Sequence, residues 1–442
     1  MWKSLKRFSS QQIIIVGFAA LILLGALLLM LPFSTRDGQG ASLPDALFTA
    51  VSASCVTGLV VQDTATYWSG FGQAIILLLI QVGGMGFVTF SVLFSLIFGQ
   101  QISLKRRGTM QDAISAPALG SIVQLTGMVF RMTVLFELVG AALFSLRFCR
   151  IFGPWRGLWY GLFHGVSAFC NAGFDLMGVQ GRYSSLTAFP ADPIVNLAAM
   201  AMILLGGIGF LTWEDVGKFR HHLRRYRMQT KVVLVTYGFL ILLPFLYFLL
   251  FEFTSLPPAQ RIWGALFQSV TTRTAGFNTL DLTKLSDRGI GVMIPLMLTG
   301  GSPGSTAGGA KVTTLAVLVS TAVAVFRRNE DTEFFGRRVS PDTVRRAAAI
   351  ATLYLGLFFF GGLAISCLER LPLLPCLFES ASAVGTVGLT LGLTPGLGQV
   401  SRIILMLLMY AGRVGALTLM FAAMAGSRDG PARLPQESLM VG

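Results

Sequence analysis

Apolar stretches of two lengths alternate along this chain with short polar connections. Each quarter of the sequence contains a long apolar stretch, a short one of about a dozen residues, a phrase that ends in glycine, and a second long stretch. The long stretches are 12–31, 72–98, 122–147, 192–213, 231–251, 289–326, 345–368 and 399–424, and the short ones are 43–54, 156–169, 260–271 and 373–383. About 20 helical residues cross a ~30 Å hydrocarbon core and about 12 do not. The pattern therefore predicts eight membrane spans and four re-entrant helices.

The four glycine phrases are copies of one another. They end at Gly58, Gly173, Gly276 and Gly388, and a phenylalanine precedes the glycine by ten residues in three copies and by nine in the third. The steps between the glycines are 115, 103 and 112 residues. A repeat of this regularity predicts four equivalent structural units, which we place at residues 1–104, 105–220, 221–340 and 341–442.

Composition places the chain in a membrane. Hydrophobic residues make up 54% of its 442 residues and charged residues 12%, whereas soluble domains are about one quarter charged. The first apolar stretch is long enough to span, and no small-residue cleavage site follows it, so it does not read as a cleaved signal. The five cysteines contain no CxxC pair, and neither a metal site nor a disulfide framework is indicated.

The net charge of +14 indicates topology rather than binding to nucleic acid. Basic residues gather in every second connection, within 3–7, 105–107, 218–231, 327–346 and 428–433. This is the positive-inside pattern, which predicts a multi-pass protein of the cytoplasmic membrane with both termini in the cytoplasm. The same loops suit contact with anionic lipid.

The four glycine phrases predict a pore. Irregular backbone at membrane depth is tolerated only where it is buried in protein or lines water, and four such loops satisfy this by ringing one axis. Carbonyl oxygens can replace the hydration shell of a cation where glycine permits unusual dihedral angles. We therefore predict a selectivity filter that holds a cation at the carbonyls of the four glycines. Its residues are Cys55, Val56, Thr57, Gly58, Cys170, Asn171, Ala172, Gly173, Arg273, Thr274, Ala275, Gly276, Gly385, Thr386, Val387 and Gly388.

Carboxylates follow three of the filter glycines. They are Asp63, Asp175 and Asp281, two to five residues after the glycine. At an outer mouth they would raise the local concentration of cations. Aspartates that cap turns are the alternative, and the sequence leaves both interpretations open.

The third inner stretch contains a polar and flexible segment. Five glycines and a proline lie between apolar residues, and such a segment does not stay helical. A polar loop at membrane depth below the filter predicts an intramembrane gate, with a turn outside the membrane as the plainer alternative. The gate residues are Gly300, Gly301, Ser302, Pro303, Gly304, Ser305, Thr306, Ala307, Gly308, Gly309 and Lys311. Lys311 either anchors this loop or extends toward the cytoplasm.

Enzymatic interpretations of this loop are weak. Gly300, Ser302 and Gly304 have the spacing of a nucleophile elbow, but no strand precedes them and the candidate base is His164, in a short helix. Lys311 follows alanine where a phosphate-binding loop needs glycine. We expect no enzymatic activity. A secondary carrier would show broken helices in two inverted halves, whereas this sequence shows direct repeats.

With these phrases the chain resembles the Trk/Ktr/HKT superfamily of potassium transporters over nearly its whole length. The superfamily has four outer helix–pore helix–inner helix units and one filter glycine per unit, which match Gly58, Gly173, Gly276 and Gly388. Length and the absence of extra amino-terminal spans make the chain most similar to the Ktr-type membrane subunit. The resemblance implies K⁺ uptake without a bound cofactor, and glycine rather than serine at position 58 favours K⁺ over Na⁺. Since each strand has one glycine, we expect weaker discrimination than in tetrameric channels.

The resemblance also implies partners and a second gating element. It implies a homodimer on a cytosolic RCK-type nucleotide-binding ring, which the basic loops could contact. Arg413 lies inside the last apolar stretch, where an arginine is costly and by default functional. The resemblance implies a positive barrier in the permeation path. A partner for the carbonyls of the gate loop is the alternative, and both can hold together.

Overall fold

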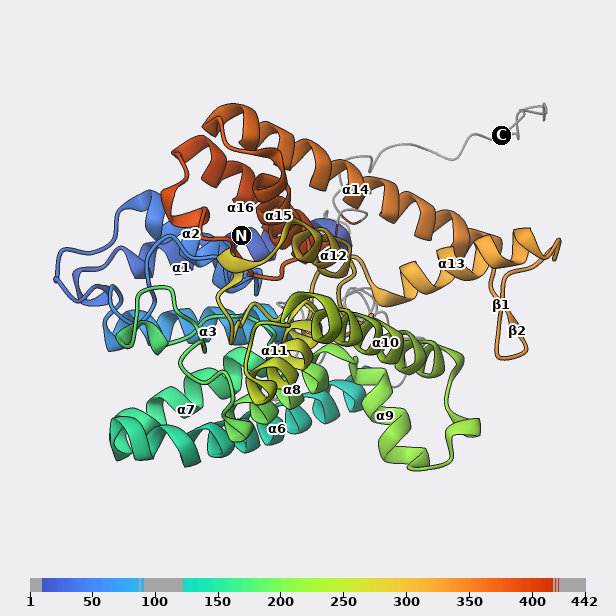
Figure 1. Cartoon of the computed structure of the whole chain (residues 1–442), viewed down its shortest axis with the longest axis horizontal. Coiled ribbons are helices and arrows are strands. Elements are labelled where there is room, and N and C mark those ends of the chain that lie inside the picture. The colour runs from blue at the N-terminus through green and yellow to red at the C-terminus, as the bar shows by residue number, and fades with distance from the viewer. Residues whose placement is uncertain (1–9, 87–88, 91–121, 416–417, 419, 421–442) are drawn as a thin grey trace, which may run out of the picture.

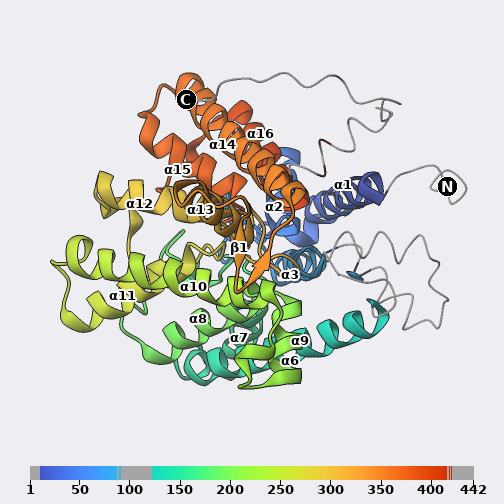
Figure 2. The same cartoon turned by 90° about the vertical axis from the view of Figure 1, so that its right-hand side faces the viewer.

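The structure is a computed structural model of the chain and describes residues 10–86, 89–90, 122–415, 418 and 420. Helices dominate it, and the described strands form one antiparallel hairpin, β1 (Glu333–Phe334) with β2 (Arg337–Arg338). Four groups of helices surround a common centre in chain order (Figure 2). The predicted all-α class is confirmed, with a pseudo-fourfold arrangement.

Each group repeats the order outer helix, short helix, inner helix (Figure 1). The helices are α1 (Ser10–Leu29), α2 (Leu43–Ser54) and α3 (Gly70–Met85); α6 (Ile122–Phe152), α7 (Pro154–Phe169), α8 (Pro193–Gly207) and α9 (Phe210–Phe219); α10 (Met228–Tyr247), α11 (Pro258–Thr271), α12 (Asp287–Leu298) and α13 (Val312–Phe326); and α14 (Pro341–Glu369), α15 (Leu373–Val384) and α16 (Gln399–Val414). A π turn, η5 (Phe248–Glu252), extends α10, and 3₁₀ turns lie at η2 (Pro32–Ser34), η3 (Met177–Val179), η4 (Leu223–Arg225), η6 (Leu282–Lys284) and η7 (Thr394–Gly396). The four short helices match their predicted bounds to within two residues.

Proline marks the start of every short helix. Pro44, Pro154 and Pro258 lie in the first turn of α2, α7 and α11, and Pro372 precedes α15. The fixed φ of proline suits a first turn, and its missing N–H is one that the turn would leave unpaired. The local sequence thus sets where each short helix begins.

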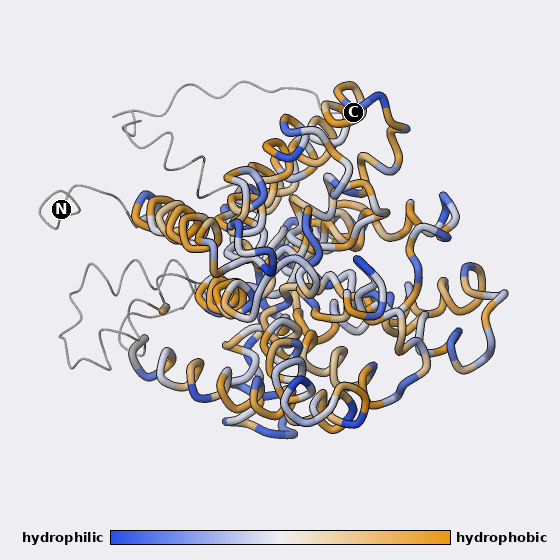
Figure 3. The backbone as a smooth tube through the Cα atoms, turned by 90° about the vertical axis from the view of Figure 1, so that its left-hand side faces the viewer, coloured by the Kyte–Doolittle hydropathy of each residue, from blue (hydrophilic) through white to orange (hydrophobic). Residues whose placement is uncertain are grey.

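The outer helices have the properties of membrane spans. Within the described ranges, α1, α6, α14 and α10 with its π turn are long and apolar enough to cross a membrane, and α8 with α9 makes a fifth if the pair counts as one span. Leu24, Phe239 and Phe360 are among the large apolar side chains that these helices expose. In Figure 3 the orange of apolar positions recurs along the backbone of the peripheral helices. Such surfaces fit hydrocarbon. The predicted continuations of α3 to residue 98 and of α16 to residue 424 lie almost wholly outside the described residues.

The prediction of one continuous helix over 192–213 is wrong. This stretch forms α8 and α9, which are bent by 97°. Gly209 lies between them with φ +93°, a conformation that glycine adopts at little steric cost. The carbonyl of Gly207 accepts hydrogen bonds from the Tyr237 hydroxyl at 2.7 Å and from the Ser302 N–H at 3.0 Å. These long-range bonds take the place of helical ones and stabilise the bend.

The prediction of a break in the third inner stretch is confirmed. There α12 ends at Leu298 and α13 begins at Val312. The boundaries between units at residues 105, 221 and 341 stay predictions. The first of them lies outside the described residues, and Pro341 is the first residue of α14.

Glycines permit two kinds of close helix packing. A Cβ on Gly83, Gly206 or Gly412 of an inner helix would collide with the carbonyl of Ser54, Phe169 or Val384, the last residue of the short helix in the same group. On α7, the glycines at 157, 161 and 165 lie against the backbone of α6. Small residues at a spacing of four let two helices approach closely inside a membrane.

The α6–α7 contact predicts a position that tolerates no side chain. A Cβ on Gly161 would lie 2.8 Å from the carbonyl oxygen of Ala141 and 2.9 Å from the Ser145 nitrogen. We expect Gly161→Val to destabilise the protein by about 1–3 kcal/mol through overpacking, seen as a lower midpoint of thermal unfolding in detergent. Gly127→Ala on α6 is the control, because no atom lies within 4 Å of its Cβ position. An unchanged midpoint for Gly161→Val would contradict the packing.

Candidate functional site

The four glycine phrases share one unusual backbone conformation. Two residues before the glycine, a residue with a side chain has a left-handed φ: 55° at Val56, 57° at Asn171, 61° at Thr274 and 51° at Thr386. The glycines follow with φ of 94°, 70°, 78° and 91° in the same order. A left-handed φ is costly for a β-branched residue, and such strain persists only where the surroundings impose it. Its recurrence at all four positions marks one site made of four parts.

Each glycine phrase, called a filter strand from here on, is hydrogen-bonded through a backbone N–H to the short helix of its own group. The residue before each glycine donates its N–H to a carbonyl of the short helix. The bonds are Thr57 to Ser52 at 2.8 Å, Ala172 to Ser167 at 2.8 Å, Ala275 to Thr271 at 3.0 Å and Val387 to Ser382 at 2.7 Å. Within the described part of the chain, no hydrogen bond is recorded to the carbonyl oxygens of Thr57, Ala172, Ala275 and Val387. These oxygens are therefore available to a ligand.

The same four carbonyls close a ring. Each filter glycine lies against the carbonyl that precedes the glycine of the next group. A Cβ on Gly58 would lie 2.5 Å from the oxygen of Ala172, one on Gly173 2.8 Å from that of Ala275, one on Gly276 2.5 Å from that of Val387, and one on Gly388 would collide with that of Thr57. The chain thus brings the predicted filter residues together around one centre, and a side chain at any of the four glycines would disturb the ring.

A set of hydroxyl groups, which was not among the predicted site residues, lies behind the ring. They lie six residues before the glycine in three groups and five in the third. The Ser52 and Ser382 hydroxyls accept the N–H of Gly58 and Gly388 at 3.1 and 3.0 Å, and those of Ser167 and Thr271 donate to the carbonyls of Phe174 and Phe277 at 2.7 and 2.5 Å. The sequence does contain a signal for these groups, because every copy of the phrase has a serine or threonine five or six residues before its glycine.

The third strand differs through Arg273. Its side chain is buried, and Nη2 donates to the carbonyl of Leu296 at 2.7 Å, near the end of α12. Cations near the carboxyl end of a helix are favourable because that end carries partial negative charge. The backbone of Arg273 therefore belongs to the filter strand, whereas its guanidinium group stabilises the end of the broken inner helix.

The predicted gate residues form a closed loop between α12 and α13. Thr299 pairs with Ala310, and the Gly300 N–H donates to the Ala310 carbonyl at 2.6 Å. The loop contacts α8 and α9 through three backbone bonds, Ser302 N–H to Gly207 at 3.0 Å, Thr306 N–H to Gly206 at 3.2 Å and Phe210 N–H to Gly304 at 2.7 Å. These bonds connect the break in the third group to the bend in the second.

The loop also lies against the filter strands. The Thr306 hydroxyl shares its one proton between the carbonyl of Phe169 at 3.0 Å and Oδ1 of Asn171 at 3.2 Å. A Cβ on Gly308 would collide with the side chain of Thr386. A Cβ on Gly309 would lie 2.8 Å from the carbonyl oxygen of Gly385. The segment thus occupies the side of the filter where the short helices end.

Two cations hold the loop in this place. Arg413 donates to the carbonyls of Thr306 on the loop and of Gly83 and Gly84 on α3. Lys311 Nζ donates to the Ala307 carbonyl at 2.8 Å. This geometry corresponds to one of the two roles considered for Arg413, contact with the carbonyls of the loop. For Lys311 it corresponds to anchoring the loop.

The three aspartates lie in different environments. Asp63 is buried, with Oδ1 accepting from Ala65 and Thr66 and Oδ2 accepting the Tyr183 N–H at 2.9 Å. Asp175 accepts the Met177 N–H at 2.8 Å. Asp281 is exposed, and its hydrogen bond from the Thr283 hydroxyl holds the pKa of the carboxyl below its ordinary value. Asp63 therefore has the contacts of a turn-capping residue, which the sequence left as an alternative.

This fold and site define a polytopic membrane protein with a central ring of four backbone strands. Known protein families, proteins and structures similar to this chain support the same class. A model of the TrkH family, described as "Cation transport protein", matches residues 4–428. The chain belongs to this family, which is one of transporters and not of enzymes.

Relatives extend over the whole chain. The chain is 38% identical to Ktr system potassium uptake protein B of Bacillus subtilis, over 99% of this chain and 97% of that protein. It is 37% identical to potassium/sodium uptake protein NtpJ of Enterococcus hirae, over 99% and 98%. The crystal structure of the potassium transporter TrkH from Vibrio parahaemolyticus has the same fold, with a TM-score of 0.72, 20% identity and coverage of 94% of this chain and 85% of that one.

The hydroxyls behind the ring predict a local change in amide protection. Ser52→Ala removes the acceptor of the buried Gly58 N–H. We expect exchange of amides in residues 52–60 to speed up about five- to tenfold, the equivalent of about 1 kcal/mol for one hydrogen bond. Hydrogen–deuterium exchange with mass spectrometry measures this. Ser69→Ala is the control, because Ser69 accepts a glycine N–H in the same way at the start of α3. Equal rates in 52–60 for Ser52→Ala and the unaltered chain would refute the assignment.

Proposed function

We propose that this chain is the pore-forming membrane subunit of a potassium uptake system. The observation that supports this most is the ring of four carbonyls closed by Gly58, Gly173, Gly276 and Gly388. Such a ring offers oxygen atoms in place of the hydration shell of a monovalent cation. The names of the relatives, a potassium uptake protein and a potassium/sodium uptake protein, support the same ion.

The short helices assist the ring electrostatically. Each of α2, α7, α11 and α15 ends next to a filter strand, so its partial negative charge lies close to a bound cation. Potassium moves inward down its electrochemical gradient, and the protein supplies the path rather than the energy. With one glycine per strand, discrimination against Na⁺ is modest, and a Na⁺-permeable or Na⁺-coupled transporter is the second candidate, favoured by the name of the relative from Enterococcus hirae.

A small-solute carrier is less well supported. Among the inner helices that the structure describes on both sides of a break, two are interrupted, at Gly209 and within 299–311. The interruptions nevertheless occur in successive groups that share one helix order and one central ring. They are not related as two inverted halves, which is the arrangement typical of carriers with a midplane site.

The segment 300–311 with Arg413 acts as the gate below the ring. Arg413 joins the loop to α3, so the loop cannot leave the path while these bonds persist. Its charge also opposes a cation at this point of the path. Gate and filter therefore act in series.

The subunit works in an assembly at the cytoplasmic membrane. Both termini and the basic loops at 218–231 and 327–346 face the cytoplasm, and the chain forms a homodimer. The word "system" in the names of the Bacillus relatives supports further components, of which a cytosolic RCK-type ring is our proposal. Anionic lipid is the competing partner of the same basic loops.

Uptake of Rb⁺ or K⁺ into proteoliposomes that contain only this chain tests the proposal. We expect saturable uptake with a preference for K⁺ over Na⁺, and a preference about tenfold lower in Gly276→Ser or Gly58→Ser, equivalent to about 1.4 kcal/mol. The added side chain would meet a ring carbonyl. Gly356→Ser on α14 is the control, because its Cβ position faces open space. Unchanged selectivity in both filter variants would exclude this filter. If no uptake occurs, adding the cytosolic ring decides between a closed gate and a different function.

The gate makes a separate prediction. Arg413→Ala removes three hydrogen bonds from a charged donor, each worth about 1.5–3 kcal/mol. We expect at least about a tenfold rise in the initial rate of Rb⁺ uptake, since a loss of about 1.4 kcal/mol from the closed state already raises the open population that much. A deletion within 300–309 should act in the same direction. Arg402→Ala is the matched control, because Arg402 pairs with Asp45 at the other end of α16. A rate equal to that of the unaltered chain would remove the gate assignment.

A further inference from the structure

Thr306 connects three elements through its three polar groups. Its N–H donates to the carbonyl of Gly206 on α8 at 3.2 Å, and its carbonyl accepts from Arg413 on α16. Its hydroxyl lies 3.0 Å from the carbonyl oxygen of Phe169 and 3.2 Å from Oδ1 of Asn171. Thr306 is fully buried. One residue of the gate loop is thereby bonded to the inner helices of two groups and to the second filter strand.

Asn171 continues this connection into the filter. Its Oδ1 faces the Thr306 hydroxyl, and its Nδ2 donates to the backbone carbonyl of Arg273 on the third strand at 3.0 Å. The equivalent residues of the other strands are Val56, Thr274 and Thr386. Val56 has no polar side-chain atom, and the buried hydroxyls of Thr274 and Thr386 have no hydrogen-bond partner in the described part of the chain. Asn171 is thus the residue at this position whose side chain contacts one neighbour through its oxygen and another through its nitrogen.

The surroundings leave this amide little freedom. A Cβ on Gly206 would lie 2.6 Å from Asn171 Oδ1 and 2.7 Å from the Thr306 hydroxyl, so the helix backbone packs directly against the pair. Asn171, Thr306 and Arg273 are all fully buried. A buried amide that loses a partner bears the desolvation cost of the unpaired group. The seated loop therefore supplies one of the two partners that orient the Asn171 amide.

We propose that Asn171 is a positioning residue that couples the place of the gate loop to the ion-binding geometry of the filter. With the loop in place, Thr306 orients the amide, and the amide holds the third strand at Arg273. When the loop leaves, the amide loses Thr306 and its hold on that strand weakens. This coupling rests on the proposed function, that the filter binds K⁺. By linkage it is reciprocal, so an ion in the filter stabilises the seated loop to the same degree.

The test is a double-mutant cycle that reads K⁺ binding rather than flux. The readout is the K⁺ concentration that gives half of the maximal rise in the thermal unfolding midpoint of the purified full chain in detergent, with Na⁺ as the reference ion. Asn171→Asp keeps the acceptor for Thr306 and removes the donor to Arg273, and Thr306→Val removes the hydroxyl at nearly constant volume. We expect each change to raise that concentration about fivefold, equivalent to about 1 kcal/mol for one hydrogen bond.

Non-additivity distinguishes coupling from general damage. Because either change interrupts the same connection, the double variant should need about the same K⁺ concentration as the single ones, rather than the product of the two effects, about 25-fold. Thr306→Ser should restore the binding of Thr306→Val, because it returns the hydroxyl. Rb⁺ uptake should rise in Thr306→Val, since the seated loop is less stable. If Asn171→Asp fails to fold, Thr306→Val alone still carries the binding and uptake readouts.

Matched controls lie away from the filter. Asn196→Asp removes an amide that donates to the carbonyls of Phe189 and Asp192, and Thr352→Val removes an exposed hydroxyl on α14. Both should leave the K⁺ concentration at half effect unchanged, even where the unfolding midpoint falls. Additive effects of the two filter-side changes, or faster uptake in Thr306→Val with unaltered K⁺ binding, would overturn the coupling alone. A lack of K⁺-specific stabilisation in the unaltered chain would overturn the proposed function, and the coupling with it.

Discussion

The contact between each filter glycine and the carbonyl of the next group is the constraint on which the rest of the structure depends. It closes only if four short helices deliver their ends to one centre, and each of them begins at or next to a proline that sets its start. It also requires the inner helices to approach closely, which Gly83, Gly206 and Gly412 permit because they have no side chain to collide with the last carbonyl of the short helix. The outer helices pack one apolar face against the helices around this centre and leave the other apolar face for lipid.

The third group shows how a fourfold ring acquires a loop beneath it, the segment that we propose as the gate. Its inner helix stops at Leu298, and Arg273 of the adjacent filter strand holds the carbonyl of Leu296 close to that end. The chain released by the break then crosses beneath the strands and hydrogen-bonds to α8, whose own bend exposes the carbonyl of Gly207. The ring is symmetric and the layer directly below it is not. The two are connected, because the loop can lie beneath the ring only where the inner helix is interrupted.

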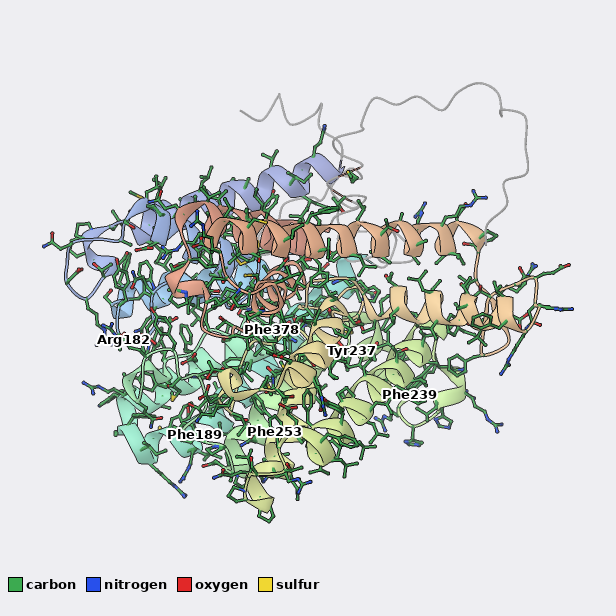
Figure 4. The ribbon with its side chains drawn as sticks, turned by 45° about the horizontal axis from the view of Figure 1, so that its top comes forward. Arg182, Phe189, Tyr237, Phe239, Phe253 and Phe378 are labelled. Carbon is green, nitrogen blue, oxygen red and sulfur yellow. The ribbon has the colours of Figure 1, made fainter. Side chains whose placement is uncertain are left out.

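The sequence predicted those parts of the fold that local chemistry decides. The short helices came out within two residues because proline starts them and the glycine phrase ends them, and the break after Leu298 was readable from five glycines and a proline. The bend at Gly209 was missed, because Gly206, Gly207 and Gly209 also fit ordinary close packing of a straight helix. The bonds that stabilise the bend come from distant segments, from Ser302 and from Tyr237, whose side chain is labelled in Figure 4. The direction of the Arg273 side chain and the capping contacts of Asp63 depend on tertiary structure in the same way.

The partners of the buried cations bear on how the proposed gate would work. In the described part of the chain, the recorded salt bridges lie away from the gate, as those of Arg147 with Asp192 and Arg402 with Asp45 do. Arg413 and Lys311 instead donate to backbone carbonyls. A carboxylate partner would cancel their charge, whereas a carbonyl satisfies the hydrogen bonds and leaves the positive charge in place. Carbonyl ligation thus lets one arginine tie the loop to α3 and, in the proposed path, also oppose a cation. In the proposed gate the two effects would end together if the loop moved, because the bonds that hold Arg413 are bonds to the loop and to α3 beside it.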